Sequence, residues 1–165
     1  MIQTKFRNEY KRLEILKAKK KNRILTLLKQ QFGIENVKGQ IIARGEERLF
    51  LYQGTLSEQE IKELENTLPV ERVGIYFAKY MPNENKVRLS VDGADLFKDQ
   101  ITKNIFELDD EQANQWLYGN EIQVKTNLND FVIIKHKDDF LGTGKASAEK
   151  ITNFVPKNRR LKEKS

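Results

Sequence analysis

The chain has 165 residues, of which 38% are hydrophobic and 33% charged, and its formal net charge is +6. This length fits one domain of ordinary size or two small domains packed together. The sequence contains no cysteine and a single histidine, His136. Their scarcity excludes disulfides, thiolate metal sites and cysteine nucleophiles, and it makes most zinc and Ser-His-Asp chemistry unavailable.

The longest apolar runs are about four residues, as in Phe131–Ile134, far short of the roughly 20 that span a bilayer. The first residues, Met1–Arg7, lack the continuous apolar stretch of a secretory signal. We therefore expect a cytoplasmic protein with no membrane partner.

The charges are unevenly distributed along the chain. Residues 1–31 carry 10 basic and 2 acidic side chains, residues 32–134 carry 11 and 18, and residues 135–165 carry 9 and 4. Basic ends favour a polyanion partner, because Lys and Arg that neutralise phosphates release condensed counterions. The cluster Lys19, Lys20 and Lys21 is one candidate contact. The alternative is a solvated Lys/Glu-rich surface.

The first half of the chain predicts two helices and a hairpin. Apolar residues spaced by three and four predict an amphipathic helix over about 8–31, either continuous or broken at the lysine cluster, with Gly33 after its end. Two strands at 39–42 and 48–52 should form a hairpin. Ser57 followed by Glu60 is a capping-box pattern that begins a second helix, which Pro69 ends.

Beyond residue 70 the composition changes to short β-branched and aromatic runs, so we place a domain boundary there. Asp109 or Asp110 should cap a short helix that ends at Gly119. Strands are expected at 73–78, 87–91, 121–125, 131–136, 140–146 and 150–155. The predicted fold class is α+β: a small basic α/β module over 1–70, a mixed β pseudo-barrel over 71–161, and a basic tail over 162–165.

Two patterns resemble catalytic motifs but have simpler interpretations. The segment 140–146 is not a phosphate loop, because Asp139 and Ala146 occupy places where that motif needs Gly and Ser or Thr. A glycine-kinked strand is the better interpretation. The carboxylate pairs Asp109-Asp110 and Asp138-Asp139 fit a helix cap and a polar turn better than an acid/base couple.

The last strand leads into a cationic segment that contains Lys157, the adjacent pair Arg159 and Arg160, Lys162 and Lys164. Arginine offers planar paired donors that match phosphate, so this segment is a second candidate contact for nucleic acid. The alternative is a disordered tail that serves only solvation.

The second half of the chain resembles PUA-type RNA-binding domains. The resemblance is carried by 87–96, 107–109, Gln112-Ala113, Trp116-Leu117, Gly119, 121–122, 141–147 and 153–161. These segments are similar to the PUA-like C-terminal domain of Sun/Fmu-family RNA cytosine-5 methyltransferases, and to its short stand-alone archaeal relatives.

The resemblance implies a pseudo-barrel that binds structured RNA, ribosomal or transfer RNA, through its first small helix, its glycine-containing loop and neighbouring strands. The positions carried over are Arg88, Asp92, Gly93, Gly142, Gly144, Lys145, Lys157, Arg159 and Arg160. The methyltransferases also have an S-adenosylmethionine fold and two catalytic cysteines. Because this chain has no cysteine, the resemblance implies no catalysis here.

The sequence therefore predicts a non-catalytic RNA-binding protein of ribosome biogenesis or RNA modification, with no cofactor or metal. A separate RNA-modifying enzyme or ribosome-assembly factor would be its protein partner. One alternative is a protein–protein adaptor that docks through the apolar stripe of the first helix. The other is an RNA-modifying enzyme that uses Asp109 or Asp138.

Overall fold

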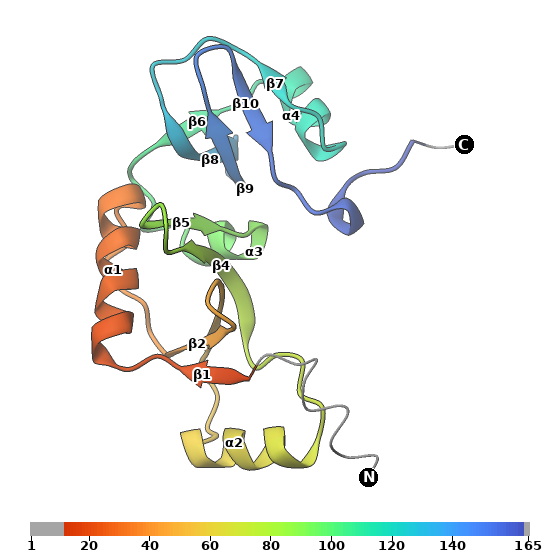
Figure 1. The fold of residues 1–165 in the computed structure, drawn as a ribbon. Helices are drawn as coiled ribbons and strands as arrows, with labels where there is room; N and C mark the ends of the chain where they lie inside the picture. The colour runs from red at the N-terminus through yellow and green to blue at the C-terminus, as the bar shows by residue number, and fades with distance from the viewer. Residues whose placement is uncertain (1–11, 164–165) are drawn as a thin grey trace.

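A computed structural model describes residues 12–163, which form two sheets with helices packed on them (Figure 1). The elements are β1 (Leu13–Ile15), α1 (Ala18–Phe32), β2 (Gln40–Arg44), β3 (Arg48–Tyr52), α2 (Glu58–Thr67), β4 (Ile75–Met81), β5 (Lys86–Leu89), α3 (Val91–Leu96), β6 (Ile105–Glu107), α4 (Asp110–Leu117), β7 (Ile122–Gln123), β8 (Asp130–His136), β9 (Asp139–Ala146), β10 (Lys150–Asn153) and the short 3-10 helix η3 (Lys157–Arg159). No helix of this part of the chain is both long and apolar enough to cross a membrane.

The first sheet is antiparallel, in the order β1-β2-β3-β4-β5, and carries a helix on each face. Successive side chains of a strand point to opposite faces. On β2, Ile41 and Ala43 accordingly belong to the core that contains α1, whereas Ile42 packs with Ile61 of α2. The sheet is therefore buried on both sides, and the expected hairpin of β2 and β3 is confirmed.

The helix expected over 8–31 begins only at Ala18, so that prediction is wrong for its first part. Leu13–Ile15 form strand β1, which pairs with β2, and the Leu13 amide donates to the Glu65 carboxylate at 2.7 Å. Leu13 and Leu16 fit a helical spacing, but the open edge of β2 offers backbone hydrogen bonds that a local pattern does not reveal. Residues 1–11, including Tyr10, lie outside the described part.

The apolar stripe of α1 is buried within the protein itself. Ile24, Leu27, Leu28 and Phe32 all belong to the main core. Gly33 ends the helix in the left-handed conformation, as expected. The adaptor interpretation is wrong about this surface, because the stripe that it needed for a partner is already covered.

The second sheet has the order β6-β8-β9-β10-β7, lies above the first in Figure 1 and curls into a half-barrel. Strand β8, which lies between β6 and β9, is buried on both faces. Phe131 and Ile133 join the core shared with α1, while Val132 and Ile134 pack with Trp116 of α4. Trp116 is fully buried and its Nε1 donates to the Leu141 carbonyl at 3.1 Å.

The expected strands of the second half are largely present, but their grouping differs. β4 and β5 belong to the first sheet, so the half-barrel takes its strands from residue 105 onward and not from 72. The predicted boundary near residue 70 falls between α2 and β4, and strands from both sides of it share one sheet. The division into domains at that position stays a prediction. Helix α3 and the parallel strand β6 had no pattern that predicted them.

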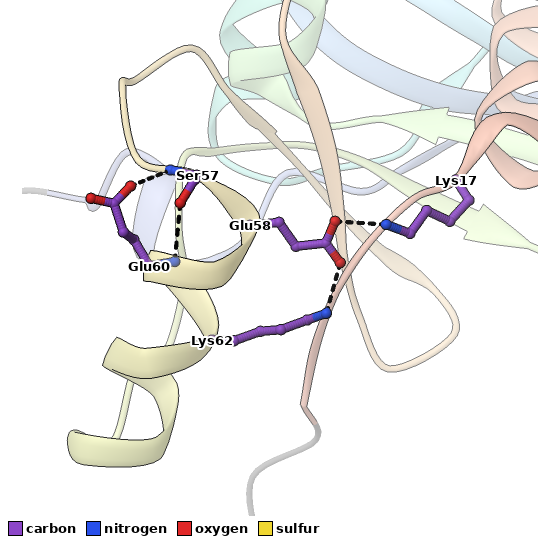
Figure 2. A network of polar contacts seen from close by, with 5 residues as sticks. All are labelled: Lys17, Ser57, Glu58, Glu60 and Lys62. Carbon is purple, nitrogen blue, oxygen red and sulfur yellow. Dashed lines mark hydrogen bonds and ion pairs between the residues drawn. The ribbon is translucent and has the colours of Figure 1, made fainter.

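Helix α2 begins with the predicted capping box, which Figure 2 shows together with two ion pairs. Ser57 Oγ accepts from the Glu60 amide at 3.2 Å, and the Glu60 carboxylate accepts from the Ser57 amide at 2.7 Å. Glu58 accepts from Lys17 at 2.6 Å and from Lys62 at 2.7 Å. Since Lys17 directly precedes α1, Glu58 connects the beginnings of the two helices.

The pKa of Glu58 is lowered from 4.5 to about 2, first by the hydrogen bond from Lys17 and next by that from Lys62. A carboxylate with a lowered pKa in the folded state stabilises it above the unfolded pKa and loses this effect as the pH falls toward the folded pKa. We expect Glu58→Gln to lower stability above pH 4.5 and to matter progressively less toward pH 2. Urea unfolding of both proteins across this range tests it, and a difference independent of pH would contradict it.

Candidate functional site

A cleft of about 320 Å³ lies where β3, β4, β5 and α3 meet β9 and the segment that follows β10. It is lined by Arg48, Arg72, Tyr76, Arg88, Leu89, Ser90, Val91, Asp92, Leu141, Gly142, Thr143, Phe154, Val155, Pro156, Asn158 and Arg159. The cleft therefore combines side chains from both sheets. Of the candidates named from the sequence, it brings together Arg88, Asp92, Gly142 and Arg159.

Four arginines and one carboxylate give the cleft a net positive charge. Arg48 comes from β3, Arg72 from the segment before β4, Arg88 from β5 and Arg159 from η3. Arg72 is exposed and makes no hydrogen bond or ion pair with any other residue of 12–163. A guanidinium retains its charge at any physiological pH, so the cleft attracts anions throughout that pH range.

Two of these arginines lie over aromatic rings that also line the cleft. The Arg88 guanidinium carbon is 4.2 Å from the centroid of the Phe154 ring, and that of Arg48 is 5.0 Å from the centroid of Tyr76. A cation over a ring face is attracted by the ring quadrupole. This attraction holds each guanidinium beside its ring on the lining of the cleft.

Asp92 makes a two-bond pair with Arg159, Nη2 to Oδ1 at 3.0 Å and Nη1 to Oδ2 at 3.3 Å. Asp92 stands in the first turn of α3, whose cap is Ser90, with Ser90 Oγ accepting from the Gly93 amide at 2.9 Å. A carboxylate repels phosphate, so Asp92 here positions an arginine and does not itself attract an anion.

Two glycines let the walls of the cleft approach closely. A Cβ on Gly93 would lie 2.0 Å from the Phe77 carbonyl oxygen, so α3 rests directly on β4. Gly142 has φ of +90°, a conformation that L-residues with a side chain adopt only with strain. A Cβ there would come 3.1 Å from Val91 of α3. Gly142 gives β9 the glycine kink that the sequence predicted, and Gly93 lets α3 pack closely on β4.

The remaining candidates from this half of the chain lie near the cleft without lining it. Lys145 is exposed, with its Nζ 5.4 Å from the centroid of the Phe131 ring and 3.7 Å from Glu84. Lys157 is exposed on η3. A Cβ on Gly144 would meet Ile151 and Trp116, which places it in the barrel core. Arg160 Nε donates to the Val155 carbonyl at 2.9 Å, which fixes the C-terminal segment.

The lysine cluster is elsewhere. Lys19, Lys20 and Lys21 lie in the first turns of α1, at the lower left of Figure 1, whereas η3 lies at the upper right. Lys20 pairs with Glu14 at 2.8 Å, and Lys21 donates to the Gly39 carbonyl at 3.4 Å. These lysines belong to a different surface from the cleft.

The acidic pairs have structural partners. Asp109 caps α4 in a capping box with Gln112, as expected. Asp110 accepts from His136 at 2.7 Å and from Lys137 at 2.8 Å. The hydrogen bond from Lys137 and then that from His136 lower the pKa of Asp110. Asp138 stands in the turn between β8 and β9, and neither it nor Asp109 lines the cleft.

Sequence reasoning missed four residues that define the cleft: Arg48, Arg72, Tyr76 and Phe154. The alternation along β4 places Tyr76 on the opposite face from the buried Phe77, and this was a visible signal. The position of Phe154 beneath Arg88 depends on how the two sheets pack, which no local pattern contains.

Thr143, on the wall of the cleft, is 3% exposed, and its hydroxyl has no hydrogen-bond partner among residues 12–163. An unpaired buried hydroxyl costs free energy, whereas a methyl group of the same shape does not. We expect Thr143→Val to raise the free energy of unfolding by about 1 kcal/mol, as measured by urea denaturation. A loss of stability of similar size would show that the hydroxyl has a partner in the folded protein.

Comparison with known protein families gives a match for part of the chain. Residues 103–161 match the family model for the methyltransferase RsmF PUA domain. Among curated proteins, none matches the chain. The matched segment runs from just before β6 through η3 and so contains the half-barrel. The chain thus contains a PUA-like domain that resembles the C-terminal domain of Sun methyltransferases, as the sequence indicated. PUA domains are known RNA-binding domains, so the match supports RNA as the kind of partner.

Proposed function

We propose that this protein binds structured RNA through the arginine-lined cleft and catalyses no reaction. The main support for this proposal is the position of the cleft. One wall is formed by β9 and η3 of the PUA-like segment. Three of the four cleft arginines come from the part of the chain before residue 103, and the fourth, Arg159, comes from η3.

The chemistry of the cleft supports RNA as the ligand. Arginine donates paired N–H groups in the geometry of phosphate oxygens, and phosphate contacts supply most of the affinity in nucleic-acid complexes. Lys145 and Lys157 are exposed on β9 and η3, two elements that also contribute to the cleft, so they offer further cations to a longer anion. Shape and a few contacts to bases or ribose would supply selectivity.

The more specific parts of the proposal follow from the resemblance to the Sun-type domain. The RNA would be ribosomal or transfer RNA in the cytoplasm, and the role would lie in ribosome biogenesis or RNA modification. In that role the protein would present RNA to a separate modifying enzyme or assembly factor. No observation favours an adaptor that works without RNA, since the helix stripe such an adaptor would use is buried.

The test measures RNA affinity across salt concentrations for two arginine variants. Arg72→Ala removes a cation that has no partner in the described residues, and Arg159→Ala removes the cation held by Asp92. Each should weaken binding to ribosomal or transfer RNA purified with the protein from its source cell. Each should also reduce the slope of log affinity against log salt by about 0.7–0.9, the value for one lost phosphate contact.

Arg23→Ala is the matched control, because Arg23 is an exposed arginine of α1 that does not line the cleft. It should leave affinity and slope nearly unchanged. Arg160 is unsuitable for this test, since its contact with Val155 supports the fold. Equal effects of all three variants would contradict a localised site, and absence of RNA binding by the unmodified protein would overturn the proposed function.

A further inference from the structure

The cleft contains flat surfaces in addition to charge, which a site for phosphate alone does not need. Arg48 over Tyr76 and Arg88 over Phe154 are two cation–π pairs on its lining. Unpaired bases stack on aromatic rings and on guanidinium planes, whereas bases inside a duplex are already stacked on each other. The lining therefore matches a nucleotide whose base is free.

The size of the cleft also favours a single unpaired nucleotide. Its volume of about 320 Å³ lies at the lower end of the range of about 300–1,000 Å³ found for small-molecule sites. A paired RNA stem is too wide and too stiff to enter such a space. A single nucleotide that has left its stem brings one base and one phosphate, which are the two groups that rings and arginines recognise.

Most of the arginines that line the cleft lie outside the segment that matches the PUA domain. Arg48, Arg72 and Arg88 precede residue 103, and only Arg159 falls within the matched segment. Tyr76 also belongs to the first sheet. The part of the chain before residue 103 therefore adds to the half-barrel an aromatic ring and three cations.

On the basis of the proposed function, we propose that the cleft binds one unpaired nucleotide, with its phosphate at the arginines and its base against the Arg48–Tyr76 pair. The ligand chemistry is that of a nucleoside monophosphate, carried either within RNA or free. Arg48 is the residue that distinguishes an unpaired nucleotide from a stem, since it supplies a plane as well as a charge.

The experiment compares three probes on the full chain by fluorescence anisotropy. They are a fully paired RNA hairpin, the same hairpin with one bulged nucleotide, and a free nucleoside monophosphate added as competitor. The unmodified protein should bind the bulged hairpin about tenfold more tightly than the paired one, the effect of one stacked base. Competition by the free monophosphate would show that the nucleotide alone suffices, and a bulge preference without competition would identify RNA as the source.

Arg48→Lys is the decisive variant, because it keeps the charge and loses the guanidinium plane. It should lower affinity for the bulged hairpin more than affinity for the paired one, so that the preference for the bulge is lost, while the salt slope stays close to that of the unmodified protein because the charge is retained. Arg23→Lys, the same change on α1, should preserve the preference. Arg48 is exposed, so the fold should survive, and a thermal melt checks this.

The outcomes separate this inference from the function on which it rests. Equal affinity for paired and bulged hairpins, with normal salt dependence, would overturn the nucleotide site and leave RNA binding intact. Retention of the bulge preference by Arg48→Lys would overturn the role of the Arg48–Tyr76 pair. Failure to bind either hairpin or cellular RNA would overturn the proposed function as well.

Discussion

The burial of β8 on both faces is the constraint on which the rest of the structure depends. Its run Phe131–Ile134 contributes alternate side chains to two different cores, one shared with α1 and one with α4. Continuous apolar runs of this kind suit strands covered on both sides, and each fully buried side chain contributes about 1.5–3 kcal/mol. Because β8 contributes side chains to both cores, it holds the two sheets together. The cleft forms where the two sheets meet, so it depends on this packing.

The cleft is where the two sheets meet on the surface. Close contacts of Gly93 with β4 and of Gly142 with α3 hold its walls together. Rings then hold two arginines in place, and a carboxylate holds a third. Such positioning reduces the conformational entropy that long cationic side chains lose when they bind an anion. The site is therefore preorganised for its ligand.

The features predictable from sequence were those that short segments encode by themselves. The capping box of Ser57, the helix cap at Asp109, which was one of two candidates, and the hairpin of β2 and β3 follow from spacing and capping chemistry. Strand β1 was mistaken for helix because its pairing with β2 is not local. The residues that line the cleft were only half recovered for the same reason. Arg88, Asp92 and Arg159 follow from family resemblance. The pairing of β3, β4 and β5 brings Arg48 and Tyr76 beside Arg88, and the packing of the two sheets brings them beside Arg159.

The most direct test of the account is a map of where RNA touches the protein. The full chain would be irradiated with ultraviolet light on RNA from its source cell and digested, and the crosslinked residues identified by mass spectrometry. We expect crosslinks to concentrate on the strand containing Tyr76 and on the segment from Phe154 to Arg159, which line the same cleft. Crosslinks confined to the first turns of α1, around Lys19–Lys21, would contradict it, because that surface is separate from the cleft.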